Sequence, residues 1–115
     1  MFNLGVNDWG GGLPDENTWK TGYQYIIDAC VVKWPSAKIY IVKPWNRGYT
    51  ASATTMAGWI DALIAANPGV VFAGHNEAVW LEGGDNGVTM TADGTHYSAA
   101  GNTEAINQWM TVLGY

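Results

Sequence analysis

Two groups of polar residues near opposite ends of the chain have the types and spacing needed for acid–base chemistry. Asp93 precedes His96 by three residues, and a carboxylate beside an imidazole can fix its tautomer so that the other ring nitrogen acts as a general base. Asn7 follows Gly5 near the N-terminus and offers a side-chain amide that donates hydrogen bonds. The residue types therefore predict a carboxylate–imidazole pair for acid–base chemistry and a separate amide that can donate hydrogen bonds.

The helices that would position these groups are indicated by hydrophobic periodicity. Apolar residues at three- and four-residue steps predict helices over about 16–34, about 52–66 and from about 98 onward. Asp15 is the expected N-cap of the first helix, and Pro35 ends it. The faces expected to be buried consist of Trp19, Tyr23, Ile26, Ile27, Cys30, Val31 and Trp34 on the first helix, Met56, Trp59, Ile60, Leu63 and Ile64 on the second, and Ile106, Trp109, Met110 and Leu113 on the third.

Three short apolar segments, at 1–4, 38–43 and 70–73, predict strands that alternate with these helices. Such alternation predicts one α/β domain with a parallel sheet, right-handed crossovers and helices on both faces. The polar segments that follow the strands leave their carboxyl ends, where open α/β sheets bind ligands. Residues 74–94 are expected to form a long irregular segment, and segments of that length are usually functional.

The polar groups also resemble a known family when they are taken together with their neighbours. Gly5-Val6-Asn7-Asp8 and Asp93-Gly94-Thr95-His96 are similar to the third and fifth sequence blocks of the SGNH (GDSL-type) hydrolases, and the likeness continues through Ser98 to Gly101. The resemblance covers nearly the whole chain. It implies a three-layer α/β/α, flavodoxin-like fold with strand order 2-1-3-4-5, truncated here to its last three β/α units within a single domain over 1–115.

The resemblance implies carboxylic ester hydrolysis with a role for each matched residue. His96 would be the general base, Asp93 would orient it, and Asn7 would donate to the oxyanion. The family's Gly-Asp-Ser block, which holds the nucleophilic serine, does not occur in the chain and would lie upstream of Met1. The nucleophile would then come from another polypeptide segment or from a surrogate, for which Ser52 and Ser98 are the candidates, although capping a helix is the default role of both.

Several aromatic and polar residues are candidates for contact with the substrate. Trp9, Trp45 and Trp80 are expected in loops at the carboxyl end of the sheet, where they could wall an acyl or sugar pocket. His75 and Glu77 follow the last strand and either line the cleft or solvate a loop. A small ester is the expected substrate, and the loop tryptophans favour an acylated carbohydrate.

Composition argues against other classes of function. The net charge is −5 and no cluster of Lys and Arg occurs, so we expect no nucleic-acid partner. No apolar run approaches the roughly 18 residues of a membrane span, so we expect no membrane partner. The His75, Glu77, Asp93 and His96 set lacks a recognised metal-ligand spacing, so we expect no metal and no cofactor. Cys30, the one cysteine, is expected to pack in the core.

The edge of the first predicted strand suggests association. In a free-standing copy, the strand at 1–4 would have an unpaired apolar edge, and such edges promote pairing with another chain. We therefore expect a homodimer or pairing with the missing N-terminal half of the fold. The alternative to an active esterase is a catalytically inactive, truncated or assembly-only fragment that keeps the fold without the chemistry.

Overall fold

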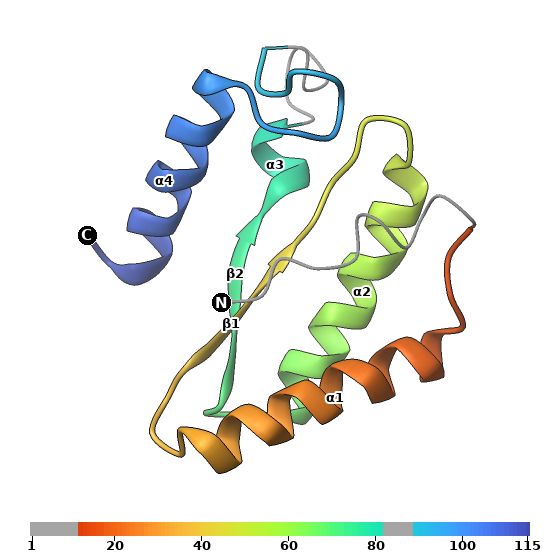
Figure 1. Ribbon diagram of the computed structural model, residues 1–115, viewed down its shortest axis with the longest axis vertical. Coiled ribbons are helices and arrows are strands. Elements are labelled where there is room, and N and C mark those ends of the chain that lie inside the picture. Colours follow the sequence, from red (N-terminus) through yellow and green to blue (C-terminus); the bar gives the residue numbers. More distant parts are fainter. Residues whose placement is uncertain (1–11, 82–88) are drawn as a thin grey trace.

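A computed structural model describes residues 12–81 and 89–115 of the chain. The described part is a mixed α/β structure with a two-stranded parallel sheet and four helices (Figure 1). The strand predicted at 1–4 lies outside the described residues. In chain order the elements are α1 (Glu16–Lys33), β1 (Ile39–Lys43), α2 (Thr50–Ala66), β2 (Val71–Asn76), α3 (Glu77–Leu81) and α4 (Ala99–Leu113).

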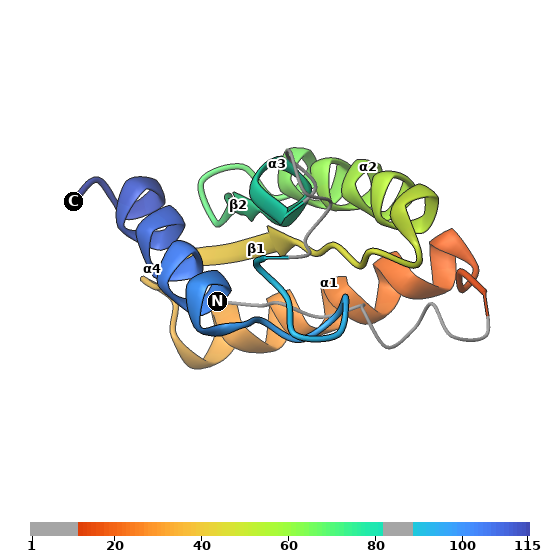
Figure 2. The ribbon, with the colours of Figure 1, turned by 90° about the horizontal axis from the view of Figure 1, so that it is seen from above.

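Helices α1 and α2 lie on one side of the two strands and pack against each other (Figures 1 and 2). The Asp15 carboxylate accepts the backbone N–H of Thr18, which confirms the predicted N-cap of α1. The indole rings of Trp19 and Trp59 meet between the helices at a centroid distance of 5.7 Å. The core on this side contains most of the residues predicted from periodicity, which include Trp19, Tyr23, Ile27, Met56, Trp59, Ile60 and Leu63, with Ile39, Ile41 and Val71 from the strands.

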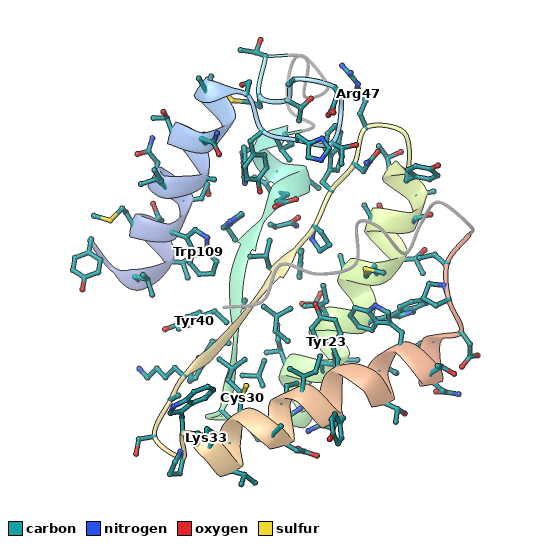
Figure 3. All side chains as sticks on the ribbon, viewed as in Figure 1. Tyr23, Cys30, Lys33, Tyr40, Arg47 and Trp109 are labelled. Carbon is teal, nitrogen blue, oxygen red and sulfur yellow. The ribbon has the colours of Figure 1, made fainter. Side chains whose placement is uncertain are left out.

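Helix α4 lies on the opposite side of the strands and covers them with one large side chain (Figure 1). The Trp109 indole meets Tyr40 of β1 edge-on, with ring centroids 6.1 Å apart, and it points from α4 toward the sheet (Figure 3). The prediction that Ile106, Met110 and Leu113 are buried is wrong, because their side chains are 63%, 46% and 49% exposed. We call these three residues the α4 stripe.

Two other predictions from local pattern are wrong. Trp34, expected on the buried face of α1, is the C-cap residue and is mostly exposed, because the chain leaves the helix there. The segment after the last strand is more regular than expected. Strand β2 continues through His75 to Asn76, and α3 follows at once. Residues 74–81 of the predicted irregular segment are therefore regular, and they bring Glu77 to the end of the sheet.

The two strands run in the same direction, with Ile39 opposite Val71 and Lys43 opposite Asn76. Their carboxyl ends therefore meet at one edge of the sheet. The segment between β1 and α2, helix α3 and the turn before α4 all lie at this edge (Figure 1). The residues predicted to do chemistry are expected at this edge of the sheet.

Candidate functional site

The turn that contains Asp93 and His96 lies across the carboxyl end of β1. We call residues 91–97 the His96 turn. The Asn46 side-chain amide donates a hydrogen bond of 2.7 Å to the Thr95 hydroxyl, and the backbone N–H of Arg47 donates one of 3.1 Å to the carbonyl oxygen of Gly94. These bonds join segments almost fifty residues apart and place the imidazole at the edge where the strands end.

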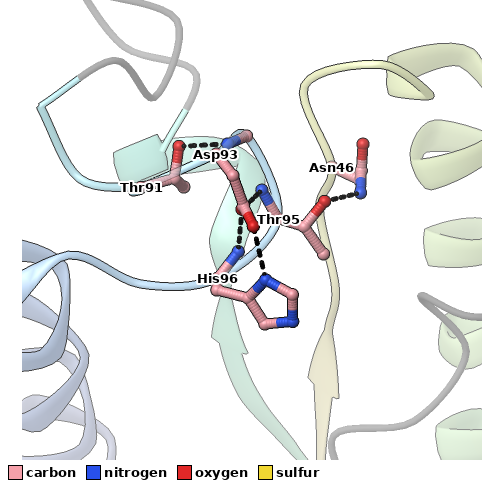
Figure 4. Close-up of polar contacts among 6 residues, drawn as sticks. Asn46, Thr91, Asp93, Thr95 and His96 are labelled. Carbon is pink, nitrogen blue, oxygen red and sulfur yellow. Dashed lines mark hydrogen bonds and ion pairs between the residues drawn. The ribbon is translucent and has the colours of Figure 1, made fainter.

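Asp93 organises the turn through both of its carboxylate oxygens (Figure 4). Oδ1 accepts the backbone N–H groups of Thr95 at 2.9 Å and of His96 at 2.8 Å. Oδ2 lies 2.7 Å from Nδ1 of the His96 ring. An aspartate that accepts backbone N–H groups two and three residues ahead forms a local turn by itself. The carboxylate is thereby held in place before it meets the imidazole.

The backbone of the His96 turn is closed by further hydrogen bonds. Thr91 and Tyr97 pair as an antiparallel bridge, and the N–H of Ala92 donates to the carbonyl oxygen of His96 at 2.8 Å. Gly94 has a φ of +92°, a conformation that side chains with a Cβ rarely adopt. Its N–H donates to the Thr91 hydroxyl at 3.0 Å. Glycine is therefore needed at the tip of this turn.

The contact with Asp93 selects, for the neutral His96 ring, the tautomer whose acceptor nitrogen is Nε2. Hydrogen bonds from the backbone N–H and ring of His96, and from the Thr95 N–H, hold the pKa of Asp93 well below its usual range. The carboxylate is therefore ionised near neutral pH and accepts Nδ1–H, which leaves the lone pair of the ring on Nε2. The His96 side chain is 80% exposed. Nε2 is therefore accessible to a substrate or to a nucleophile.

A buried carboxylate lies beneath the His96 turn. Glu77, at the junction of β2 and α3, is only 2% exposed. One of its oxygens accepts the backbone N–H of Trp45 at 2.9 Å, and the other accepts the hydroxyl of Tyr97. Glu77 thus joins the end of β1 to the last residue of the His96 turn.

The start of α4 is fixed to the same segment. The Ser98 hydroxyl caps the helix by accepting the N–H of Gly101 at 3.1 Å, and it donates to the carbonyl oxygen of Thr89 at 2.7 Å. A Cβ at Gly101 would lie 1.9 Å from the carbonyl oxygen of Met90. Only glycine allows this close approach of α4 to the segment that leads into the His96 turn.

Comparisons with family models, with curated proteins and with solved structures found no match.

The residues predicted to contact substrate lie mostly inside the protein. Trp45 is 2% exposed and belongs to the core. Trp80 is in α3 rather than in a loop, and its indole N–H lies 3.3 Å from Nδ1 of His75. His75 is a buried residue of β2, and burial lowers its pKa. These positions favour packing roles for all three residues. Asn7 and Trp9 lie outside the described residues.

The two candidate surrogate nucleophiles differ in their surroundings. Ser98 uses its hydroxyl in the cap and in the bond to Thr89. Ser52 is half-buried in the first turn of α2 and is not the cap, since the helix begins two residues earlier than predicted and its N-cap is Tyr49. Ser52 lies at the carboxyl end of the sheet, because α2 begins there (Figure 1).

Across 12–81 and 89–115, no group of three or more His, Cys, Asp and Glu side chains could hold a metal ion. No helix in the same ranges has the length and hydropathy to cross a membrane.

Sequence reasoning missed the residues that hold the His96 turn in place. The sequence pattern predicts only a cleft or loop position for Glu77, and it indicates no role for Asn46 or Tyr97. One sequence pattern does distinguish Glu77: it is the single charged residue in an otherwise uncharged run from Val70 to Leu81. A lone carboxylate at the carboxyl end of a predicted strand is a reasonable candidate for a buried hydrogen-bond acceptor.

Proposed function

We propose that the chain is part of a carboxylic ester hydrolase of SGNH type, with a flavodoxin-like arrangement of three layers. The observation that supports this most directly is the 2.7 Å contact between Asp93 Oδ2 and His96 Nδ1 at the carboxyl end of parallel strands. The exposed Nε2 is on the ring edge that a general base would use. Helices on both sides of the sheet are in keeping with the proposed layers (Figure 2).

The reaction would be acyl transfer to a serine followed by hydrolysis. As the serine oxygen attacks the ester carbonyl, Nε2 of His96 takes the hydroxyl proton. The Asn7 amide donates a hydrogen bond to the carbonyl oxygen while that oxygen is negative. His96 then gives the proton to the leaving alcohol. Water attacks the acyl-serine by the same route, which releases the carboxylic acid and restores the serine.

The nucleophile would be supplied by a polypeptide segment outside these 115 residues, or inefficiently by Ser52. Ser98 is the weaker surrogate because its hydroxyl already makes two hydrogen bonds in the cap. The substrate would be a small ester. An acylated carbohydrate remains the proposed class, and Trp9, which lies outside the described residues, remains the tryptophan proposed to contact it.

A protein partner is part of the proposal. The uncharged α4 stripe is exposed on the side of the sheet that only α4 covers in the described residues, and exposed apolar patches mark interaction sites. A second copy of the chain, or the N-terminal half of the fold, would cover this surface. The same stripe supports the alternative function, an inactive fragment that only assembles, so activity must decide between the two.

Hydrolysis of p-nitrophenyl acetate, together with mass mapping of a fluorophosphonate adduct, tests the proposal. His96→Ala should abolish turnover, and Asp93→Asn should lower kcat by about 10⁴-fold because the imidazole takes the wrong tautomer. Asp61→Asn is the matched control, because Asp61 is an exposed carboxylate that pairs with Lys43 of β1, and it should leave the rate unchanged. An adduct on Ser52 would identify the surrogate. If neither turnover nor an adduct is observed, the result would favour the inactive fragment.

A further inference from the structure

We infer that Glu77 is a positioning residue that holds the His96 turn on the end of the sheet, through the hydroxyl of Tyr97. The inference rests on the proposed function only in taking His96 as the base. The hydrogen bonds that it concerns are independent of that function.

The position of Glu77 is the first reason. Its carboxylate is almost completely buried, and burying a charge is costly unless hydrogen bonds compensate it. The Trp45 N–H and the Tyr97 hydroxyl provide such bonds from two different segments. Because α3 begins at Glu77 directly after β2, the carboxylate connects both strand ends to the turn. A neutral side chain could not accept both donors equally well.

The attachment of Tyr97 is the second reason. Its ring packs against Trp80 of α3 with a centroid distance of 5.4 Å, and its backbone pairs with Thr91 across the base of the turn. Tyr97 directly follows His96, so a shift of Tyr97 moves the imidazole. At the tip, the turn is held by Asn46 and Arg47. Glu77 therefore fixes the base of the turn, and the segment after β1 fixes its tip.

The two carboxylates at this site act in different ways. Asp93 is exposed and contacts the imidazole directly. Glu77 is buried and acts on His96 through Tyr97. Asp93→Asn should change the tautomer, while its amide oxygen can still accept the backbone N–H groups that form the turn. Loss of the Glu77 bond should loosen the whole turn.

Tyr97→Phe tests this most cleanly, because it removes the hydroxyl and keeps the ring on Trp80. Tyr40→Phe is the matched control, since Tyr40 is a half-buried tyrosine of β1 that contacts Trp109. Hydrogen exchange is followed at the Ala92 and Arg47 amides, both of which are bonded within the turn or to it. We expect about tenfold faster exchange in Tyr97→Phe, as for the loss of one net hydrogen bond, and no change in Tyr40→Phe.

A second readout distinguishes positioning from general stability. Nitrogen-15 shifts of the His96 ring report the fraction of Nδ1–H tautomer, which should fall in Tyr97→Phe and in Glu77→Gln. It should not fall in Glu104→Gln, a half-buried glutamate of α4 that accepts from Gln108. Amides in the middle of α2 should keep their exchange rates. Equal acceleration in α2 and in the turn, or an unchanged tautomer, would overturn the inference.

Neither readout depends on turnover, so the two ideas can fail separately. If ester hydrolysis needs His96 but Tyr97→Phe leaves the tautomer and the turn unchanged, the role of Glu77 is wrong and the proposed function stands. If Tyr97→Phe loosens the turn in a chain without esterase activity, Glu77 anchors the turn and the proposed function is wrong.

Discussion

The two sides of the sheet differ in how fully the chain covers them. On the side of α1 and α2, Ile27, Ile41 and Ile60 are almost completely buried in one cluster with the surrounding tryptophans. On the side of α4, Trp109 packs on Tyr40 and His75, while the α4 stripe remains exposed. Both helical layers come from amphipathic sequences. The difference teaches that periodicity specifies which face of a helix is apolar, and that the surrounding structure determines whether this face is covered.

Truncating one isoleucine on each side tests this difference most strongly. Ile60→Ala should lower the free energy of unfolding by about 2–5 kcal/mol, because it leaves a cavity in a packed core. Ile106→Ala should change that free energy by less than about 0.5 kcal/mol, because the side chain is already exposed. Urea denaturation measures both. Similar losses in the two variants would mean that α4 is covered in solution, for example by a second copy.

Charging the α4 stripe tests whether it is an interaction surface. The double change Ile106→Asp with Met110→Asp should weaken self-association at least tenfold, or about 1.4 kcal/mol, because it places carboxylates in an apolar contact. The control is Tyr25→Asp with Val32→Asp, which charges exposed apolar residues on α1. Sedimentation velocity measures both. A dimer that is unaltered in the α4 variant would exclude the α4 stripe as the surface of self-association. A monomeric wild type would exclude self-association itself.

Removing the N-caps compares the attachment of α1 with that of α4. Asp15→Ala and Ser98→Ala should each lower the free energy of unfolding by about 1 kcal/mol. Amide exchange should become faster in α1 for Asp15→Ala and in α4 for Ser98→Ala. Ser98→Ala should leave any ester hydrolysis nearly unchanged. Loss of turnover together with loss of the fluorophosphonate adduct would instead identify Ser98 as the nucleophile.

Acidification should weaken the α4 side through His75. Burial lowers the pKa of His75 below its ordinary 6.5, so the unfolded chain binds a proton more readily than the folded protein. The free energy of unfolding should therefore be unaffected above about pH 6.5 and should fall as the pH decreases below that value. Urea denaturation between pH 7.5 and 5.5 measures the slope. His75→Gln, which retains an acceptor for Trp80, should reduce the slope of the free energy of unfolding against pH. Equal slopes in the wild type and the variant would contradict the role given to His75.

Much of the secondary structure could be predicted because its determinants are local. Asp15 and Pro35 bracket α1, and β1 is a β-branched and aromatic run. The end of β2 and the presence of α3 could not be predicted, because Gly74 and His75 interrupt the apolar pattern. His75 belongs to the strand since its ring meets Trp80 and Trp109. Those contacts exist only after α3 and α4 have packed.

The contacts of the candidate site also fall into local ones, which could be predicted, and long-range ones, which could not. Three residues separate Asp93 from His96, so the turn that joins them is built from neighbouring backbone N–H groups, and the sequence by itself determined this pair. The Glu77–Tyr97 and Asn46–Thr95 bonds join residues 20 and 49 positions apart. Only the tertiary structure decided these contacts, because they require two parallel strands to end at one edge and α4 to begin beside them. Short-range hydrogen bonds depend on local backbone conformation, whereas long-range ones depend on how the packed elements bring distant segments together.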